Sequence, residues 1–225
     1  IREMDDWKVG WARKGGKITG VMAPGHSVPR CVYVDFLNTG PAVAKCLRTQ
    51  VVKADTVMRV SGLAINDVVV DDGVVTGAVG WNLEDEEPVT IAANAVIIAA
   101  GGLTRLYQRN SASVNMNGDG YAMALRAGAE LIDMEFPQFF PIGHLAPRLV
   151  GMDPIMWDPF RYKLGGRLFN AEGEEFLHRY GGEDAEKYTT TRDIISYGIT
   201  KENEAGRATE NGGVHLSFQH IPEEK

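Results

Sequence analysis

The order of helical and β-prone segments in this sequence predicts an α/β (α+β) fold that contains part of a parallel sheet. Three observations lead to this prediction. A helix begins near residue 39, a β-meander occupies residues 63–92, and the apolar run of residues 95–102 follows the meander. A short apolar run bounded in this way is typical of a strand buried on both faces of a parallel sheet. The meander is then expected to be a small antiparallel insert.

Composition places the chain among ordinary globular proteins and excludes several classes. Its 225 residues suffice for one large or two small domains, and 44% of them are hydrophobic. A net charge of −7 argues against nucleic-acid binding. No apolar run is long enough to span a bilayer, and we recognise no signal peptide, although any leader would precede Ile1. We expect a cytoplasmic protein, with any membrane association made through a partner.

The spacing of cysteines and histidines predicts no metal site. Cys31 and Cys46 are too few for a disulfide framework and lack the CxxC spacing. The five histidines form no pair at helical spacing. The sequence also lacks a P-loop, a GxSxG elbow and a GxGxxG fingerprint. We therefore expect two reduced thiols and no nucleotide-binding motif of these kinds within the chain.

The first sixty residues predict one well-defined helix. Asn38 or Thr39 can cap it, and Pro41 is tolerated in its first turn. Apolar residues then recur at helical spacing. Residues 31–34 and 56–60 are short β-prone pieces on either side of this helix.

The meander consists of three predicted strands. Residues 63–70 and 74–81 flank the turn Asp71-Asp72-Gly73. An Asp-Gly pair between two β-prone runs is a strong signal for a hairpin. Residues 89–92 continue the β pattern after an acidic turn.

The run of residues 95–102 is central to the functional interpretation. It ends in four small residues, Ala99, Ala100, Gly101 and Gly102. The glycines remove Cβ atoms and add backbone freedom. Ligands of open α/β sheets bind beyond the carboxyl ends of the strands, so a large ligand could approach the backbone here. The alternative is a buried strand that runs into a tight turn, and the run alone leaves both alternatives open.

A second helix is predicted after Gly118-Asp119-Gly120. Residues 121–129 are apolar nearly all round, which predicts a buried helix, and Gly128 is a natural C-cap. Asp119 at the helix start is either a simple N-cap or a hydrogen-bond acceptor for a hydroxyl-rich cofactor.

The sequence changes character after residue 136. Five prolines lie within residues 136–160, with few helix signals between them. We take this change as the boundary between a first domain of residues 1–136 and a second domain of residues 137–225.

The second domain holds three further predicted elements and one unusual cation. A hairpin turn is predicted within residues 165–174, a helix start at residues 189–193 and a late strand at residues 213–218. Arg192 lies in the first turn of that helix, where a cation opposes the helix dipole. Either Asp193 compensates this charge, or the arginine is retained for a purpose.

Nine short motifs along the chain share their order and spacing with a known family. They are TVMRV (56–60), AVIIAAGG (95–102), RLY (105–107), NGDG (117–120), MALRAG (123–128), DMEF (133–136), GGRLFN (165–170), TRD (191–193) and GVHL (213–216). Each motif is modest alone, whereas their order is specific. On these motifs, the chain from about residue 24 onward resembles the fumarate reductase/succinate dehydrogenase flavoprotein family, which includes L-aspartate oxidase.

The resemblance implies part of an FAD-binding domain followed by part of a capping domain. Substrate would be held between the two, and hydride would pass between the flavin and an unsaturated or saturated acid-like substrate. The resemblance further implies that the small residues Ala99, Ala100, Gly101 and Gly102 lie close to FAD and that Asp119 is an FAD ligand.

Arg192 matches the catalytic arginine of that family, which exchanges a proton with a dicarboxylate. Arginine is a poor acid by its pKa alone. The resemblance therefore implies a proton relay and a dry site, which closure of a capping domain would provide.

Two departures from the family pattern concern the substrate pocket. The QFHPT segment of the family is QFFPI here, so Phe140 replaces the histidine that binds a substrate carboxylate. The substrate threonine of the family aligns with Asp158, whose charge would repel a dicarboxylate. His144 and Arg161 are candidates to compensate. We expect a substrate that is less acidic or more apolar near Phe140, and slow turnover of fumarate.

The resemblance also implies that the FAD site is incomplete in this chain. The nucleotide fingerprint, the flavin-attachment region and the carboxyl-terminal part of the family have no counterpart here, so we expect the isolated chain to be inactive. Two alternatives stay open. One is a non-catalytic flavoprotein-like module. The other is a flavoprotein subunit that docks to an iron–sulfur electron-transfer partner, which would supply the cluster ligands.

Overall fold

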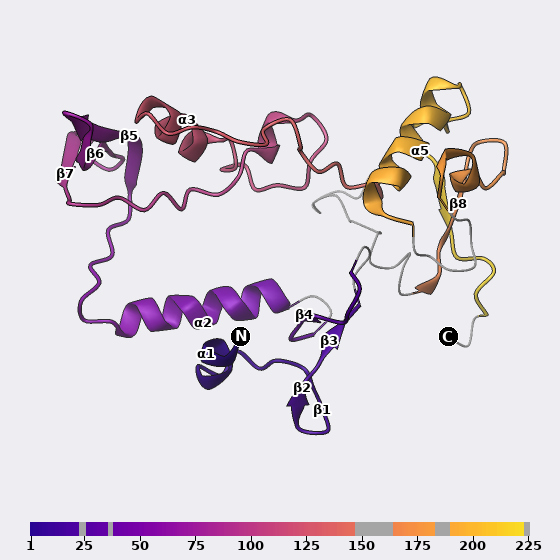
Figure 1. The fold of residues 1–225 in the computed structure, drawn as a ribbon, viewed down its shortest axis with the longest axis horizontal. Coiled ribbons are helices and arrows are strands. Elements are labelled where there is room, and N and C mark those ends of the chain that lie inside the picture. Colours follow the sequence, from indigo (N-terminus) through magenta and orange to yellow (C-terminus); the bar gives the residue numbers. More distant parts are fainter. Residues whose placement is uncertain (23–25, 36–37, 147–163, 183–189, 223–225) are drawn as a thin grey trace. The chain divides into compact units, whose positions relative to one another are not determined.

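The structure is a computed structural model of mixed helix and sheet (Figure 1). By their internal contacts, the described residues fall into two units, one within residues 1–58, 139–146 and 164–222 and the other within residues 59–138. The domain division at residue 136 stays a prediction. None of the helices in the described ranges combines the length and apolarity needed to cross a membrane. The residues that the structure describes are 1–22, 26–35, 38–146, 164–182 and 190–222.

The amino-terminal part of the first unit contains the predicted helix and short strands. Helix α2 spans Thr39–Lys53 with Asn38 at its N-cap, which confirms the predicted helix start. The buried side chains Val9, Trp11 and Cys46 form a small core beside α2. The other elements here are α1 (Arg2–Asp6), the β1 (Arg13–Lys14) and β2 (Lys17–Ile18) hairpin, and the pair β3 (Gly20–Val21) and β4 (Cys31–Val32).

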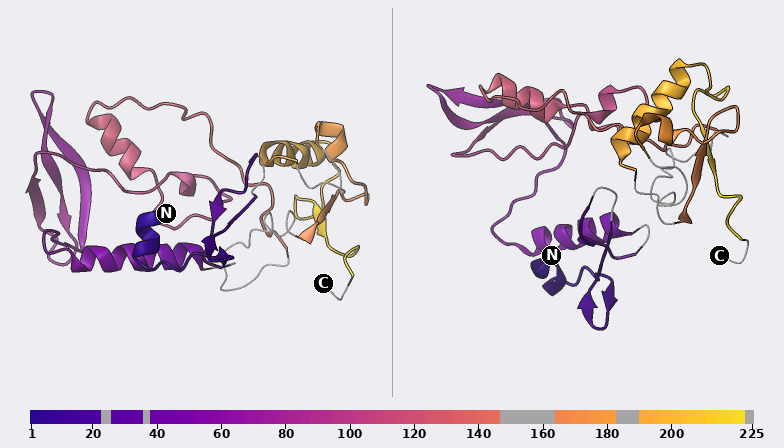
Figure 2. Two further views of the ribbon diagram at one scale, coloured as in Figure 1. Left: turned by 60° about the horizontal axis from the view of Figure 1, so that its bottom comes forward. Right: turned by 45° about the vertical axis from the view of Figure 1, so that its right-hand side comes forward.

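The meander of the second unit has the predicted three strands (Figure 2). Strands β5 (Leu63–Asp71), β6 (Val74–Asn82) and β7 (Pro88–Ala92) pair antiparallel in that order. Asp72 and Gly73 join β5 to β6 with φ angles of 46° and 75°. Two consecutive positive φ angles define a type I′ turn, whose twist matches that of the strands. The Asp-Gly signal in the sequence therefore predicted the hairpin correctly.

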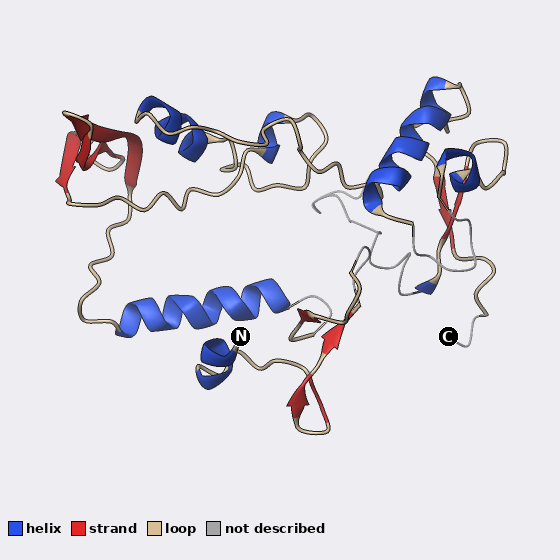
Figure 3. Cartoon of the chain, viewed as in Figure 1, coloured by secondary structure: helices blue, strands red, loops and turns tan. Residues whose placement is uncertain are grey.

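Residues 95–102 form no strand, which corrects the prediction of a buried parallel strand. The segment is drawn as loop in Figure 3, and Ile97 is 92% exposed. The physical reason is that a strand needs a hydrogen-bonded neighbour. Within the described residues all strand pairs are antiparallel, and none of them includes this segment. Its apolar side chains match a buried strand, but the described chain supplies no neighbouring strand.

Helix α3 (Asp119–Arg126) begins at the predicted position but is not buried all round. Only Gly120 and Met123 are buried, whereas Leu125 is 56% exposed. The helix packs one side against β5, where Nε of Arg126 donates a hydrogen bond to Asp67. The apolar side chains of α3 therefore extend over more of the helix surface than β5 covers.

The carboxyl-terminal part of the first unit contains its main core. Helix α5 (Arg192–Glu204) contributes Ile195, which is fully buried against Phe176 and Leu177. Ile142 and Leu168 complete this buried cluster. The surrounding elements are β8 (Arg167–Phe169), the 3-10 helix η2 (Leu177–Tyr180) and β9 (His215–Ser217), which pairs antiparallel with β8. The predicted late strand is thereby confirmed.

Candidate functional site

The predicted cofactor segments meet at the start of α3. The backbone N–H of Gly118 donates a hydrogen bond to the carbonyl oxygen of Gly102, with 3.1 Å between N and O. The N–H of Arg105 donates to the carbonyl oxygen of Met116 at 3.0 Å. These bonds close the base of the loop that carries the 3-10 helix η1 (Thr104–Leu106). The loop closure places the end of residues 95–102 beside Asp119.

Small residues allow this close approach. A Cβ atom on Gly120 would lie 3.0 Å from Cγ2 of Ile98 and 3.2 Å from Cβ of Ala100. These separations are tighter than nearly all Cβ contacts, so a larger side chain at residue 120 would push the two segments apart. Sequence reasoning identified Gly120 as part of a helix start but missed its packing role. The small-x-small spacing of Gly118 and Gly120 is the signal that could have found it.

Two features of this region are compatible with contact to part of an FAD molecule. Ala99, Ala100 and Gly101 are exposed and carry no more than a methyl group, so a flat ring system could approach their backbone. Asp119 is the first residue of α3, where main-chain N–H groups and the helix dipole favour anionic groups. The residues present therefore suit close contact with a cofactor and a hydrogen bond to its polar groups.

The predicted catalytic arginine lies at the start of α5. Thr191 is the N-cap residue, and Arg192 is the first helical residue. The hydrogen bond from the Thr191 hydroxyl lowers the pKa of Asp193, which keeps a carboxylate in the same turn as the arginine. The guanidinium carbon Cζ of Arg192 lies 4.9 Å from the centroid of the Phe140 ring. The structure thus brings together Arg192 and one residue of the predicted substrate pocket.

Of the other predicted pocket residues, the structure describes His144. His144 follows the buried Ile142 by two residues and is half-buried. Asp158 and Arg161 lie outside the described residues. The predicted cofactor segments belong to the second unit, and the segments around Arg192 belong to the first.

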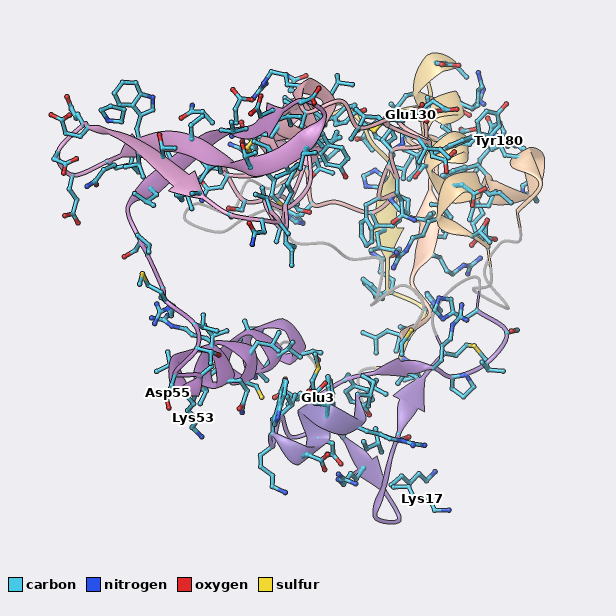
Figure 4. The ribbon with its side chains drawn as sticks, turned by 60° about the vertical axis from the view of Figure 1, so that its left-hand side comes forward. Glu3, Lys17, Lys53, Asp55, Glu130 and Tyr180 are labelled. Atoms are coloured by element: carbon cyan, nitrogen blue, oxygen red, sulfur yellow. The ribbon has the colours of Figure 1, made fainter. Side chains whose placement is uncertain are left out.

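A buried charge cluster next to α5 was missed by sequence reasoning. The carboxylate of Glu202 is fully buried and accepts hydrogen bonds from Arg207 at 2.7 and 2.8 Å. The hydroxyl of Tyr180 donates to it at 2.6 Å and the amide of Asn170 at 2.9 Å. Figure 4 labels Tyr180, which lies on η2. A glutamate on the apolar stripe that begins at Ile195 is the sequence signal for this cluster.

Hydrogen bonds from Arg207 lower the pKa of Glu202 to about 2 and outweigh the opposing effect of burial. The hydrogen bond to Glu202 raises the pKa of Tyr180, because the neutral phenol is the donor. Glu202 and Arg207 therefore stay ionised at neutral pH. The cluster anchors the carboxyl-terminal half of α5 to η2 and to the turn after β8.

Two solved structures share this fold over nearly the whole chain. The E. coli quinol fumarate reductase FrdA matches 100% of this chain and 39% of its own length, with a TM-score of 0.87 and 30% identity. The Mycobacterium smegmatis Sdh1 structure in complex with UQ1 matches 96% of this chain and 37% of its own, with a TM-score of 0.75 and 32% identity.

Curated relatives agree with the structural matches. One subunit of the fumarate reductase (CoM/CoB) of Methanothermobacter marburgensis is 38% identical over 194 residues, which cover 86% of this chain and 34% of the relative. The succinate dehydrogenase flavoprotein subunit of Rickettsia conorii is 34% identical over 212 residues, which cover 94% of this chain and 34% of the relative. The chain thus spans about a third of the length of these relatives.

The fold defines part of an FAD-binding flavoprotein. The model of the FAD binding domain family matches residues 1–225, and the chain belongs to that family. Its relatives are fumarate reductase and succinate dehydrogenase flavoproteins, as the sequence motifs predicted.

Proposed function

We propose that the full-length protein is an FAD-dependent oxidoreductase in which hydride passes between the flavin and an unsaturated or saturated acid-like substrate. One observation supports this most strongly. The bond between Gly118 and Gly102 joins two segments of small residues at one exposed surface, which supports their proposed contact with the cofactor. In this proposal Ala99, Ala100, Gly101 and Gly102 lie against FAD, and Asp119 accepts a hydrogen bond from it.

Bound FAD would supply or accept the hydride, and Arg192 would exchange the matching proton with the neighbouring carbon of the substrate. A guanidinium holds its proton tightly, so Arg192 would give up a proton only in a site that excludes water and replaces the proton at once. We propose that residues 137–225 provide this exclusion as part of a capping domain, and that residues 1–136 are part of the FAD-binding domain.

The substrate pocket is proposed to contain Phe140, His144, Asp158 and Arg161. The ring of Phe140 lies beside Arg192, and in this proposal it offers an apolar surface to the substrate. An apolar wall disfavours a second carboxylate, because burying an unpaired charge is costly. The proposed substrate class is therefore a small carboxylic acid with an apolar or weakly polar group at the end that faces Phe140.

The test of this function uses the purified full-length protein. We expect a yellow protein whose chemically reduced flavin, in the absence of oxygen, is reoxidised on mixing with fumarate or with crotonate, in which a methyl group replaces one carboxylate. Colourless protein that cannot be reconstituted with FAD would contradict the proposal, as would reduced flavin that neither acid reoxidises while a non-specific dye does.

A second proposal concerns the electron-transfer partner. Several relatives carry the word subunit in their names, which supports an assembly of more than one chain. We propose that an iron–sulfur protein exchanges electrons with the flavin. Tagged full-length protein isolated from its native host should carry a second chain together with iron and acid-labile sulfide. A tagged protein that retains flavin but contains no iron would contradict the proposed partner and leave the proposed flavin chemistry intact.

A further inference from the structure

We propose that Phe140 is a positioning residue that orients the guanidinium of Arg192 through the face of its ring. The inference rests on the proposed function, in which Arg192 is the catalytic residue. Cζ of Arg192 lies 4.9 Å from the ring centroid. This separation is inside the range of about 6 Å within which a cation is attracted to an aromatic face.

The ring is held by contacts on both sides of Phe140 along the chain. The carbonyl oxygen of Phe139 accepts a hydrogen bond from Oγ of Ser196 at 2.7 Å. Ser196 lies on α5, four residues after Arg192, so both residues face the same side of the helix. Ile142 is 6% exposed and belongs to the buried cluster that includes Ile195 of α5. The ring and the guanidinium are therefore both positioned by one helix.

The ring also reduces an electrostatic cost of the arginine's position. Arg192 is the first residue of α5, where the partial positive charge of the helix end disfavours a cation. The face of an aromatic ring carries negative potential, which attracts the guanidinium. The carboxylate of Asp193 acts in the same direction from within the first turn. Phe140 thus stabilises a charged arginine where the helix alone would oppose it.

Contact with a ring face has a chemical advantage over an ion pair. An ion pair uses N–H donors of the guanidinium for the carboxylate, whereas attraction to a ring face acts on the charge of the whole guanidinium. An arginine that must direct donors at a substrate benefits from contact with a ring face.

The experiment compares Phe140→Leu with Phe140→Tyr in the full-length flavoprotein. Leucine keeps an apolar side chain without a ring, and tyrosine keeps the ring. Loss of one partly exposed cation–ring contact should lower kcat for reoxidation of reduced flavin about threefold to tenfold in Phe140→Leu, with KM changing less. Phe140→Tyr should retain kcat within about twofold, since it preserves the face.

A matched control lies on the same helix. Nζ of Lys201 lies 5.5 Å from the ring centroid of Tyr197, which is 54% exposed. Tyr197→Leu removes the ring that contacts Lys201, another cation of α5, and leaves the contact of Arg192 with Phe140 unchanged. We therefore expect no change in kcat. The factor by which Phe140→Leu lowers kcat should also be equal for fumarate and crotonate, because leucine keeps the apolar surface and only the contact of the ring with Arg192 is lost.

Each other outcome overturns the inference. Equal kcat in Phe140→Leu and Phe140→Tyr would show that the ring is not needed, and a factor confined to one substrate would show direct contact with that substrate. If Phe140→Leu loses its flavin, the kcat of Phe140→Met is compared with that of Phe140→Tyr instead. Loss of flavin from both Phe140→Leu and Phe140→Met would show that Phe140 has a structural role. Arg192→Ala is measured separately: a wild-type rate there would refute the proposed function, whereas inactive Arg192→Ala with fully active Phe140→Leu would refute this inference alone.

Discussion

The carbonyl oxygen of Gly102 accepts a hydrogen bond from the backbone N–H of Gly118 at 3.1 Å. This bond joins the exposed end of residues 95–102 to the start of α3, and it places two distant parts of the sequence at one surface. Gly118 has a φ angle of 88°, and a Cβ atom there would lie 3.1 Å from Cβ of Leu103. The geometry of the proposed flavin surface therefore depends on a glycine at residue 118.

Gly118→Ala should weaken FAD binding. An added Cβ pushes against Leu103, and the left-handed backbone adds strain. If these effects weaken the binding free energy of FAD by about 1 kcal/mol, the dissociation constant for FAD rises about fivefold. Gly128→Ala is the matched control, because Gly128 has a φ angle of 91° but no atom within 4 Å of an added Cβ. Fluorescence titration of the apoprotein with FAD measures both constants. Equal weakening in the two variants would contradict the account.

Glu202→Gln should destabilise α5. The substitution leaves Arg207 and the hydroxyl of Tyr180 without a charged acceptor in a buried site, which costs about 2–3 kcal/mol. Glu204→Gln, two residues later, removes an exposed partner of Lys201 and should cost less than about 0.5 kcal/mol. Hydrogen exchange of α5 amides in the full-length protein measures both effects locally. Similar loss of protection in both variants would exclude a special role for the buried cluster.

The stabilisation from Glu202 should disappear in acid. Its pKa in the folded protein is about 2, below the ordinary value of 4.5, so the unfolded chain takes up the proton first as the pH falls. The contribution is therefore complete above pH 4.5 and is lost as the pH falls from 4.5 to about 2. The difference in α5 protection between the wild type and Glu202→Gln should shrink over this window. A constant difference would contradict the assigned pKa shift.

Crotonate should be turned over with a higher kcat/KM than fumarate. Phe140 offers an apolar surface beside Arg192, and a second carboxylate placed against the ring would lose hydration that the ring does not replace. Reoxidation of reduced flavin by each acid, at several concentrations, gives the two constants. A clear preference for fumarate would show that the apolar interpretation of Phe140 is wrong, while leaving the flavin chemistry intact.

Sequence alone predicted the elements whose determinants are local. The turn at Asp72-Gly73 and the start of α2 at Asn38 depend on a few adjacent residues, and both predictions are confirmed. The buried strand at residues 95–102 was wrong, because strand formation depends on a neighbour that the pattern does not reveal. Similarly, the burial of α3 depends on how much of its surface β5 covers, which its own composition cannot show.

The same distinction holds for the candidate site. The order of the motifs identified Arg192, Asp119 and the small residues from Ala99 to Gly102 as candidate site residues, because the family resemblance assigns roles to residues by their place in the sequence. The contact of Arg192 with Phe140 joins segments about fifty residues apart, and only the folded chain shows it. The hydrogen-bond partners of Glu202 likewise come from three separate segments of the chain, so their convergence follows from tertiary packing.

The central claim is that Arg192 exchanges a proton during flavin-dependent reaction of an acid-like substrate. The most direct measurement is the rate at which crotonate or fumarate reoxidises the reduced flavin of full-length protein, in the wild type and in Arg192→Ala, with flavin content and FAD affinity measured for both. We predict that Arg192→Ala retains its flavin and loses at least about a hundredfold in rate, the scale of general acid catalysis. A rate equal to that of the wild type would contradict the account.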